Sequence, residues 1–207
     1  MNVTKKDGII TDKREVITFT VFKLVEERGL HNIPVSLISK ESGVAVGTIY
    51  FYFGNKQKLM DTIYAEIMTE VSRYVSLGIE SAKTVEEKIY CFWMGYFSYC
   101  INNSLQANFI FQPGIERSIS QNVIDEGNAI FETLKNIVEE GVKNHVIIDL
   151  PYNVILSYML GPIKDIQNFY QARQLDIDEE MTNRIFGVFW AGIKNKEQHG
   201  EKEKSEI

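Results

Sequence analysis

Apolar positions recur at helical spacing along almost the whole chain, and no stretch alternates apolar and polar residues long enough to predict a strand. Near the N-terminus, Ile17, Val21, Leu24 and Val25 share one helix face, and Gly29 is a natural stop. The pattern therefore predicts an all-α protein. The expected helices cover residues 12–28, 35–42, 46–53, 85–102, 122–145, 151–174 and 178–195. A further long helix is expected after Asn55, which is its expected N-cap.

Residues 38–56 have the pattern of a helix-turn-helix. Gly43 supplies the positive φ for the tight turn, and Ile38, Val44 and Ile49 are spaced to hold two short helices together. The second short helix is then presented outward. Such a helix enters a DNA major groove with its N-terminus first.

At these residues the chain resembles the TetR family of bacterial transcriptional repressors. The resemblance implies a small DNA-binding head, a ligand-binding body and a homodimer. We expect the head at residues 1–55, a connecting helix at 56–78, the body at 79–195 and a charged tail at 196–207. The matching positions are Ile17, Gly29, Ile38, Gly43, Val44, the run from Gly47 to Phe53, Asn55, Lys56 and Leu59.

The resemblance also implies roles for single residues. Thr48 and Tyr50 would touch DNA phosphates, Tyr52 would lie against the backbone, and Lys56 would hold a phosphate from the start of the long helix. The aromatic run could instead be a small core, a role we assign to Phe53. Cations in the first turn of a helix oppose its dipole, a cost that makes sense where a phosphate binds.

One position departs from the family pattern. Where a threonine usually caps the second helix and touches a phosphate, this chain has Pro34, which donates no hydrogen bond, and Ser36 is the nearest polar substitute. The expected recognition helix is poor in base readers, because Ala45, Val46 and Gly47 offer no side-chain donors, which favours thymine methyl contacts and indirect readout. The expected DNA-binding set is Ser36, Ala45, Val46, Gly47, Thr48, Tyr50, Phe51, Tyr52 and Lys56.

Charge is distributed unevenly between the head and the rest of the chain. Residues 1–60 hold nine Lys and Arg against six Asp and Glu, although the whole chain has a net charge of −6. A basic head on an acidic body is consistent with a polyanionic partner, and double-stranded operator DNA is the expected one.

Within the expected helix 85–102, the stretch from Cys91 to Cys100 is apolar around the whole helix, which predicts burial on all sides. This helix is either simply the centre of the core or also one wall of a cavity for a hydrophobic or aromatic effector. The expected ligand-binding residues are Trp93, Tyr96, Phe97, Cys100, Phe109, Phe131 and Tyr158.

The last two expected helices carry amphipathic stripes that could pair with a second copy as a four-helix bundle. The alternative is packing within one chain. The expected dimer residues are Ile155, Met159, Ile166, Ile185, Phe189 and Ile193.

Several functional classes find no support in the sequence. Cys91 and Cys100 would lie on opposite faces of one helix, the three histidines are scattered, and no catalytic motif is present, so we expect no disulfide, no metal, no cofactor and no enzyme. We also expect no signal peptide and no membrane span, and therefore a cytoplasmic protein. We therefore expect a ligand-responsive repressor that binds a palindromic operator as a homodimer and is released by a hydrophobic small molecule. The alternative is an all-helical carrier of hydrophobic ligands with no role on DNA.

Overall fold

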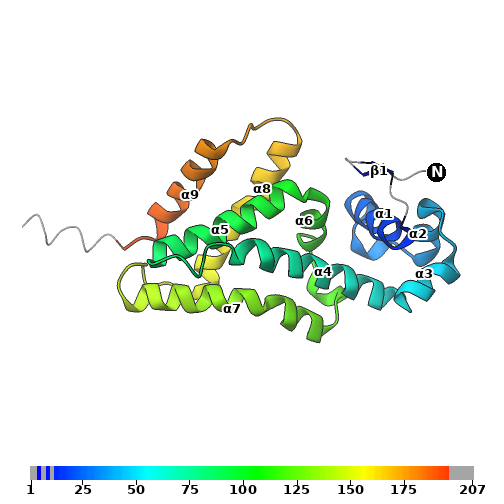
Figure 1. The fold of residues 1–207 in the computed structure, drawn as a ribbon, viewed down its shortest axis with the longest axis horizontal. Coiled ribbons are helices and arrows are strands. Elements are labelled where there is room, and N and C mark those ends of the chain that lie inside the picture. Colours follow the sequence, from blue (N-terminus) through cyan, green and yellow to red (C-terminus); the bar gives the residue numbers. More distant parts are fainter. Residues whose placement is uncertain (1–3, 6–7, 10–11, 196–207) are drawn as a thin grey trace, which may run out of the picture. The chain divides into compact units, whose positions relative to one another are not determined.

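The computed structural model describes residues 4–5, 8–9 and 12–195 (Figure 1). The expected all-α fold is confirmed, with one very short antiparallel strand pair near the N-terminus. The expected charged tail at 196–207 lies outside the described residues. The elements are β1 (Thr4–Lys5), β2 (Gly8–Ile9), α1 (Lys13–Arg28), the 3-10 turn η1 (Leu30–Asn32), α2 (Val35–Ser42), α3 (Val46–Phe53), α4 (Lys56–Ser76), α5 (Val85–Asn102), α6 (Ser104–Ile110), the 3-10 turn η2 (Ile115–Ser118), α7 (Gln121–Lys143), α8 (Tyr152–Gln171) and α9 (Glu179–Ile193).

Local sequence signals set the ends of several helices. Gly43 ends α2 with a left-handed backbone at φ 69°, as the turn requires. The side-chain oxygen of Asn55 accepts a 2.8 Å hydrogen bond from the backbone N–H of Lys58, and Asp178 accepts one of 2.7 Å from Met181. Both bonds satisfy donors that the first turn of a helix leaves free. The cap expected at Asn55 is therefore confirmed.

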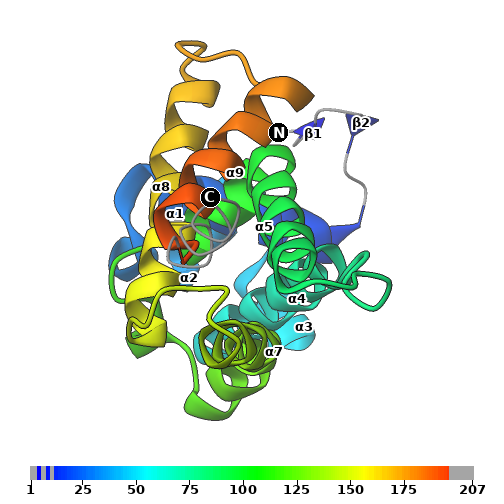
Figure 2. The same ribbon diagram turned by 90° about the vertical axis from the view of Figure 1, so that its left-hand side faces the viewer.

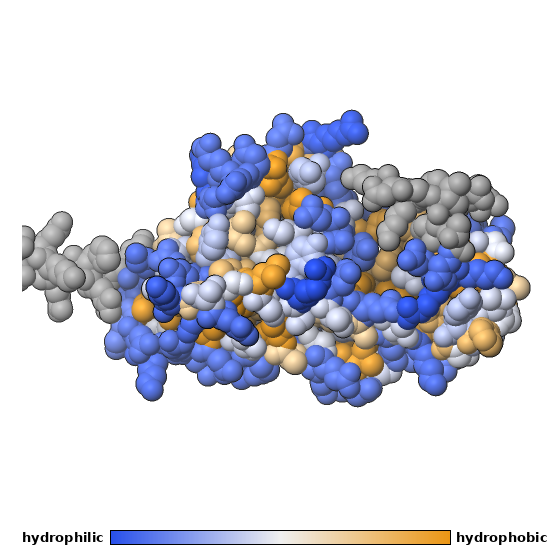
Figure 3. Space-filling view, in the orientation of Figure 1, coloured by the Kyte–Doolittle hydropathy of each residue, from blue (hydrophilic) through white to orange (hydrophobic). Residues whose placement is uncertain are grey.

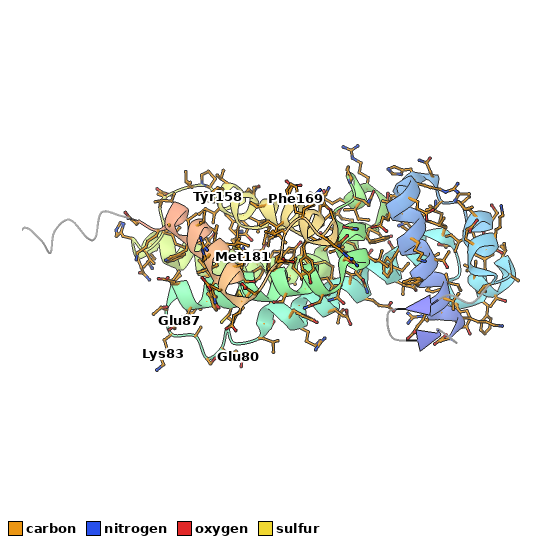
Figure 4. The ribbon with its side chains drawn as sticks, turned by 90° about the horizontal axis from the view of Figure 1, so that it is seen from above. Glu80, Lys83, Glu87, Tyr158, Phe169 and Met181 are labelled. Atoms are coloured by element: carbon orange, nitrogen blue, oxygen red, sulfur yellow. The ribbon has the colours of Figure 1, made fainter. Side chains whose placement is uncertain are left out.

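The start of α5 is stabilised by a reciprocal capping box. One carboxylate oxygen of Glu87 accepts hydrogen bonds from the backbone N–H of Lys83 at 2.7 Å and of Thr84 at 3.0 Å, and the Thr84 hydroxyl accepts from the N–H of Glu87 at 3.1 Å. Figure 4 shows Lys83 and Glu87 together at this end of the helix. These backbone hydrogen bonds lower the pKa of Glu87.

The chain forms two compact units. The first unit comprises Met1–Glu70 and Asn103–Asn128, and the second comprises Val71–Asn102 and Ala129–Ile207. The helix α6 and the first part of α7 thus belong with the helix-turn-helix, although the sequence placed everything after residue 78 in the body. The expected division into head, connector, body and tail concerns functional parts and stays a prediction.

The first unit is held together around α1, which packs against both α2 and α6. Phe22 of α1 meets Phe109 of α6 edge to face, with ring centroids 5.8 Å apart. Beside this pair, the side-chain amide of Asn108 donates a 2.8 Å hydrogen bond to Glu26. Burial of the two rings stabilises this packing, since aromatic pairs of this geometry add to the free energy of area burial.

The second unit is built on α5, which packs against α8 and α9. Its side chains Phe92, Trp93 and Tyr99 are fully buried, as the apolar pattern predicts. Figures 1 and 2 both show α8 and α9 side by side. Phe186 of α9 packs against Trp93 with centroids 5.7 Å apart. The buried side chains between Ile89 and Cys100 make α5 the centre of this unit's core, while Cys91, Met94 and Ser98 are only partly buried.

Two further findings concern the described part of the chain. None of its helices combines the length and the apolar character needed to cross a bilayer. Cys91 and Cys100 are free thiols, and Cys100 is buried.

Candidate nucleic-acid interface and ligand site

The outward face of α3 is aromatic. Ile49 and Phe53, one turn apart, are buried on the helix side that packs in the unit, which confirms the core role of Phe53. Tyr50, Phe51 and Tyr52 are 44%, 83% and 42% exposed. Three neighbouring exposed aromatic side chains on a short helix are typical of a surface that contacts a partner.

The first turn of α3 leaves its backbone open. Ala45, Val46 and Gly47 are all exposed, and a Cβ built on Gly47 would meet no atom within 4 Å. Thr48 is half-buried one position later. A flat, open first turn lets a second molecule approach the helix closely.

The start of α2 lacks a side-chain cap, as Pro34 in the sequence suggests. Pro34 is the N-cap of α2 and forms no side-chain capping bond. Ser36, in the first turn, is exposed and is available for a polar contact. The loss of a phosphate contact at position 34 thus stays an expectation.

Lys56 stands in the first turn of α4, in which no acidic residue is present. Lys56 is half-buried and forms no ion pair with a carboxylate of the described residues. The positive end of the helix dipole adds to its charge. This end of α4 is therefore a place where an anion would be stabilised.

The same lysine lines a groove of about 330 Å³ in the first unit. Two further residues with cationic or donor side chains, His31 and Arg117, line it as well. Sequence reasoning missed both, because Arg117 lies far along the chain from the helix-turn-helix and no local motif marks it. The remaining lining residues are Leu30, Gln57, Met60 and Ser118.

The seven expected ligand-binding residues are not gathered in one cavity. Trp93 and Phe97 stack with centroids 4.7 Å apart, and Tyr96 meets Phe131 at 6.4 Å. Phe109 belongs to the first unit, where it packs on α1. Cys100 is fully buried, while Tyr158 is half exposed on α8. These contacts fit the core alternative for α5, and the effector role of the set stays a prediction.

A second groove, of about 300 Å³, lies in the second unit, near the end of α7 and the start of α8. Tyr152 is one of its lining residues, and its hydroxyl donates a 2.9 Å hydrogen bond to the carbonyl of Phe131. Burial, with a smaller effect from Glu132, raises the pKa of Tyr152 to about 12. None of the seven expected ligand residues lines either groove. The other lining residues are Val138, Glu139, Val142, Lys143, Asp149 and Leu150.

The expected dimer stripe faces the protein's own core. Ile155, Met159, Phe189 and Ile193 are at most 6% exposed within one chain, and Ile166 and Ile185 are half-buried. A partner cannot reach the four buried side chains, so packing within one chain accounts for them. The reason is angular: residues one position earlier along each helix lie 100° away, and Val154, Tyr158 and Val188 at such positions are exposed.

The exposed face of α8 and α9 carries large apolar side chains together with glycine and alanine. Figure 3 shows apolar residues, in orange, among hydrophilic ones where these helices lie, and Figure 4 shows Tyr158 and Phe169 along α8 with Met181 on the neighbouring α9. Apolar patches on an exposed surface mark contact sites. We call this surface the α8–α9 face; its residues are Val154, Tyr158, Gly161, Phe169, Gly187, Val188 and Ala191.

Comparison with known proteins agrees with this geometry. A sequence model described as "Bacterial regulatory proteins, tetR family" matches residues 21–63. The chain is 25% identical over 179 residues to the "Fatty acid metabolism regulator protein" of Bacillus subtilis (strain 168), covering 84% of this chain and 92% of that one.

Solved structures are similar over nearly the whole length. A TetR family transcription regulator from Marinobacter aquaeolei VT8 has a TM-score of 0.77 at 16% identity, covering 89% of this chain and 96% of the other. The fatty acid degradation regulator FadR from Bacillus halodurans has a TM-score of 0.66 at 21% identity, with coverages of 88% and 97%. At these identities the two structures are alike in fold.

Proposed function

Since the chain belongs to the TetR family of bacterial regulatory proteins and is a transcriptional regulator, we propose that it represses transcription by binding a palindromic operator as a homodimer. The observation that carries the proposal is the first turn and outer face of α3, open and exposed, next to a lysine without a carboxylate partner at the start of α4.

On DNA, each residue of this surface has a distinct role. The open first turn around Gly47 lies against base edges in the major groove, where thymine methyl groups are apolar partners. Thr48 and Tyr50 donate hydrogen bonds to phosphates, and Lys56 holds a further phosphate. Phosphate contacts of this kind fix the orientation of the protein, while base contacts and DNA shape provide specificity.

The dimer forms through the α8–α9 face rather than through the stripe that the sequence suggested. Glycine and alanine on α9 let a second copy approach its backbone closely, and Tyr158 and Val188 supply apolar area. Two copies then form a four-helix bundle across a two-fold axis. The two α3 helices must reach successive major grooves, about 34–36 Å apart.

The effector is a hydrophobic molecule, and we propose a fatty acid or a derivative with an acyl chain. The names of the Bacillus subtilis and Bacillus halodurans relatives support this class. The aromatic side chains around Tyr96 and Phe131 are closely packed, so the ligand must displace them to enter the second unit. Because the ligand binds the arrangement with displaced side chains better than the closely packed one, it lowers the affinity of the protein for operator DNA, with a coupling of about 1–3 kcal/mol.

Salt-dependent DNA binding tests the first part. Replacing Lys56 by Ala should weaken binding to operator and to unrelated DNA alike, and should reduce the slope of log affinity against log salt by about 0.9 per protomer. Lys83→Ala is the matched control, because Lys83 is an exposed lysine in the loop before α5. If Lys56→Ala and Lys83→Ala give the same slope of log affinity against log salt, Lys56 does not contact DNA.

Adding fatty acids of increasing chain length to the bound operator tests the effector. We expect release to strengthen with chain length until the site is full. If the protein binds fatty acids but no DNA fragment, the carrier alternative replaces the proposal.

A further inference from the structure

The groove beside Lys56 is lined by positive charges that no carboxylate of the described residues pairs with. Lys56 and Arg117 both line it, and neither forms an ion pair with a carboxylate of the described residues. His31 adds an imidazole that can donate a hydrogen bond. Two like charges facing one hollow repel each other, so an anion placed between them would be stabilised.

The backbone around Arg117 is fixed against α4. The side chains on either side of it, Ile115 and Ile119, are 8% and 5% exposed. The amide of Gln57, in the first turn of α4, donates a 2.9 Å hydrogen bond to the carbonyl of Ser118. The turn η2 therefore holds Arg117 at the groove rather than leaving it on a free loop.

The nearby carboxylates are directed elsewhere. Asp61 accepts hydrogen bonds from the backbone N–H of Ser120 at 2.8 Å and from its hydroxyl at 2.7 Å, and it does not line the groove. Glu116 acts on Tyr64, about two turns along α4 from Lys56, where burial and this carboxylate raise the pKa of the phenol. Neither Asp61 nor Glu116 lines the groove, and neither forms an ion pair with Arg117.

We propose that the groove holds a phosphate of the DNA backbone and that Arg117 is a DNA-contacting residue supplied from outside the helix-turn-helix. This inference rests on the proposed DNA binding, because Lys56 is shared by the two surfaces. Guanidinium groups bind phosphate oxygens in a bidentate way, which suits a fixed turn that presents a single arginine. The contact positions the protein without reading sequence.

The test compares Arg117→Ala with Arg173→Ala, which removes the same charge from an exposed loop position in the second unit. Binding to fluorescent operator and to unrelated DNA is measured by anisotropy over a series of salt concentrations. We expect Arg117→Ala to weaken both complexes about equally and to reduce the salt slope by about 0.9 per protomer. Arg173→Ala should leave the slope unchanged, and Arg117→Lys should restore it.

Each other outcome overturns a specific statement. If Lys56→Ala lowers the slope and Arg117→Ala behaves as Arg173→Ala does, the inference fails while the proposed function stands. If the wild-type protein binds no DNA, the proposed function fails, and the inference fails with it. Inorganic phosphate is then titrated by calorimetry, and binding that Arg117→Ala abolishes would make the groove a site for free anions. Should Arg117→Ala not fold, judged by circular dichroism, Arg117→Gln takes its place.

Discussion

The close approach of α5 to α4 at Gly95 gives a quantitative prediction about the packing of these two helices. A Cβ built on Gly95 would lie 2.4 Å from the carbonyl oxygen of Tyr74 and 2.6 Å from the Cα of Val75. Both are backbone atoms, so neither can rotate away. Replacing Gly95 by Ala must therefore push α5 away from the end of α4, the helix that begins at Lys56.

The size of the effect follows from these distances. Nonbonded carbon atoms rest about 3.5–4.0 Å apart, so the two helices must separate by about 1 Å. Overpacking of this kind costs about 1–3 kcal/mol, and contact with rigid backbone places Gly95→Ala at the upper end. Alanine regains about 1 kcal/mol of helix propensity. We expect a net loss of about 2 kcal/mol, or a fall in Tm of about 4–8 °C.

Thermal unfolding followed by circular dichroism measures this loss. Gly47→Ala in α3 is the control, since a methyl group there meets nothing within 4 Å. It should raise stability by up to about 1 kcal/mol through helix propensity alone. If Gly95→Ala is as stable as Gly47→Ala, the close crossing of α4 and α5 is refuted.

Three more predictions concern the dimer, the pH dependence of stability and the thiols. Val188→Glu should give monomers in sedimentation that keep the helical circular dichroism of wild type, whereas Phe189→Glu buries an unpaired charge within one chain and should lower the Tm further; a dimeric Val188→Glu protein would contradict the α8–α9 face. The pKa of Glu87 is lowered from its usual value of 4.5, so the ionised carboxylate stabilises the fold at pH values above 4.5. The Tm difference between Glu87→Gln and wild type should therefore vanish at more acidic pH, where the carboxylate becomes protonated. Burial raises the pKa of both thiols, and we expect iodoacetamide to modify half-buried Cys91 first and Cys100 only after unfolding, as followed by mass spectrometry.

Much of the helix-turn-helix could be predicted because its determinants are local. Gly43 terminates a helix through its own backbone freedom, and Asn55 caps the next through a bond to a residue three positions away. The burial of Ile49 and Phe53 follows from helical spacing. Such features depend on neighbours within one or two turns, which the sequence lists in order.

Predictions for the body were less exact because they depend on which side of a helix meets which neighbour. The pattern placed α5 in the core, yet it could not show that Trp93 and Phe97 stack on each other. On α9, Phe189 and Val188 are both apolar and adjacent, and only packing within the second unit decides that the first is buried and the second exposed.

By itself, the sequence determined the helices other than α6, the cap at Asn55 and the outward α3, since each depends on spacing and backbone preference over a few residues. Only the tertiary structure decided that α6 packs on α1 through Phe109, that Arg117 lines a groove with Lys56, and which face of α8 and α9 stays exposed. These arrangements join residues far apart in the chain. Their free energy comes from burial and charge in three dimensions, which linear spacing does not encode.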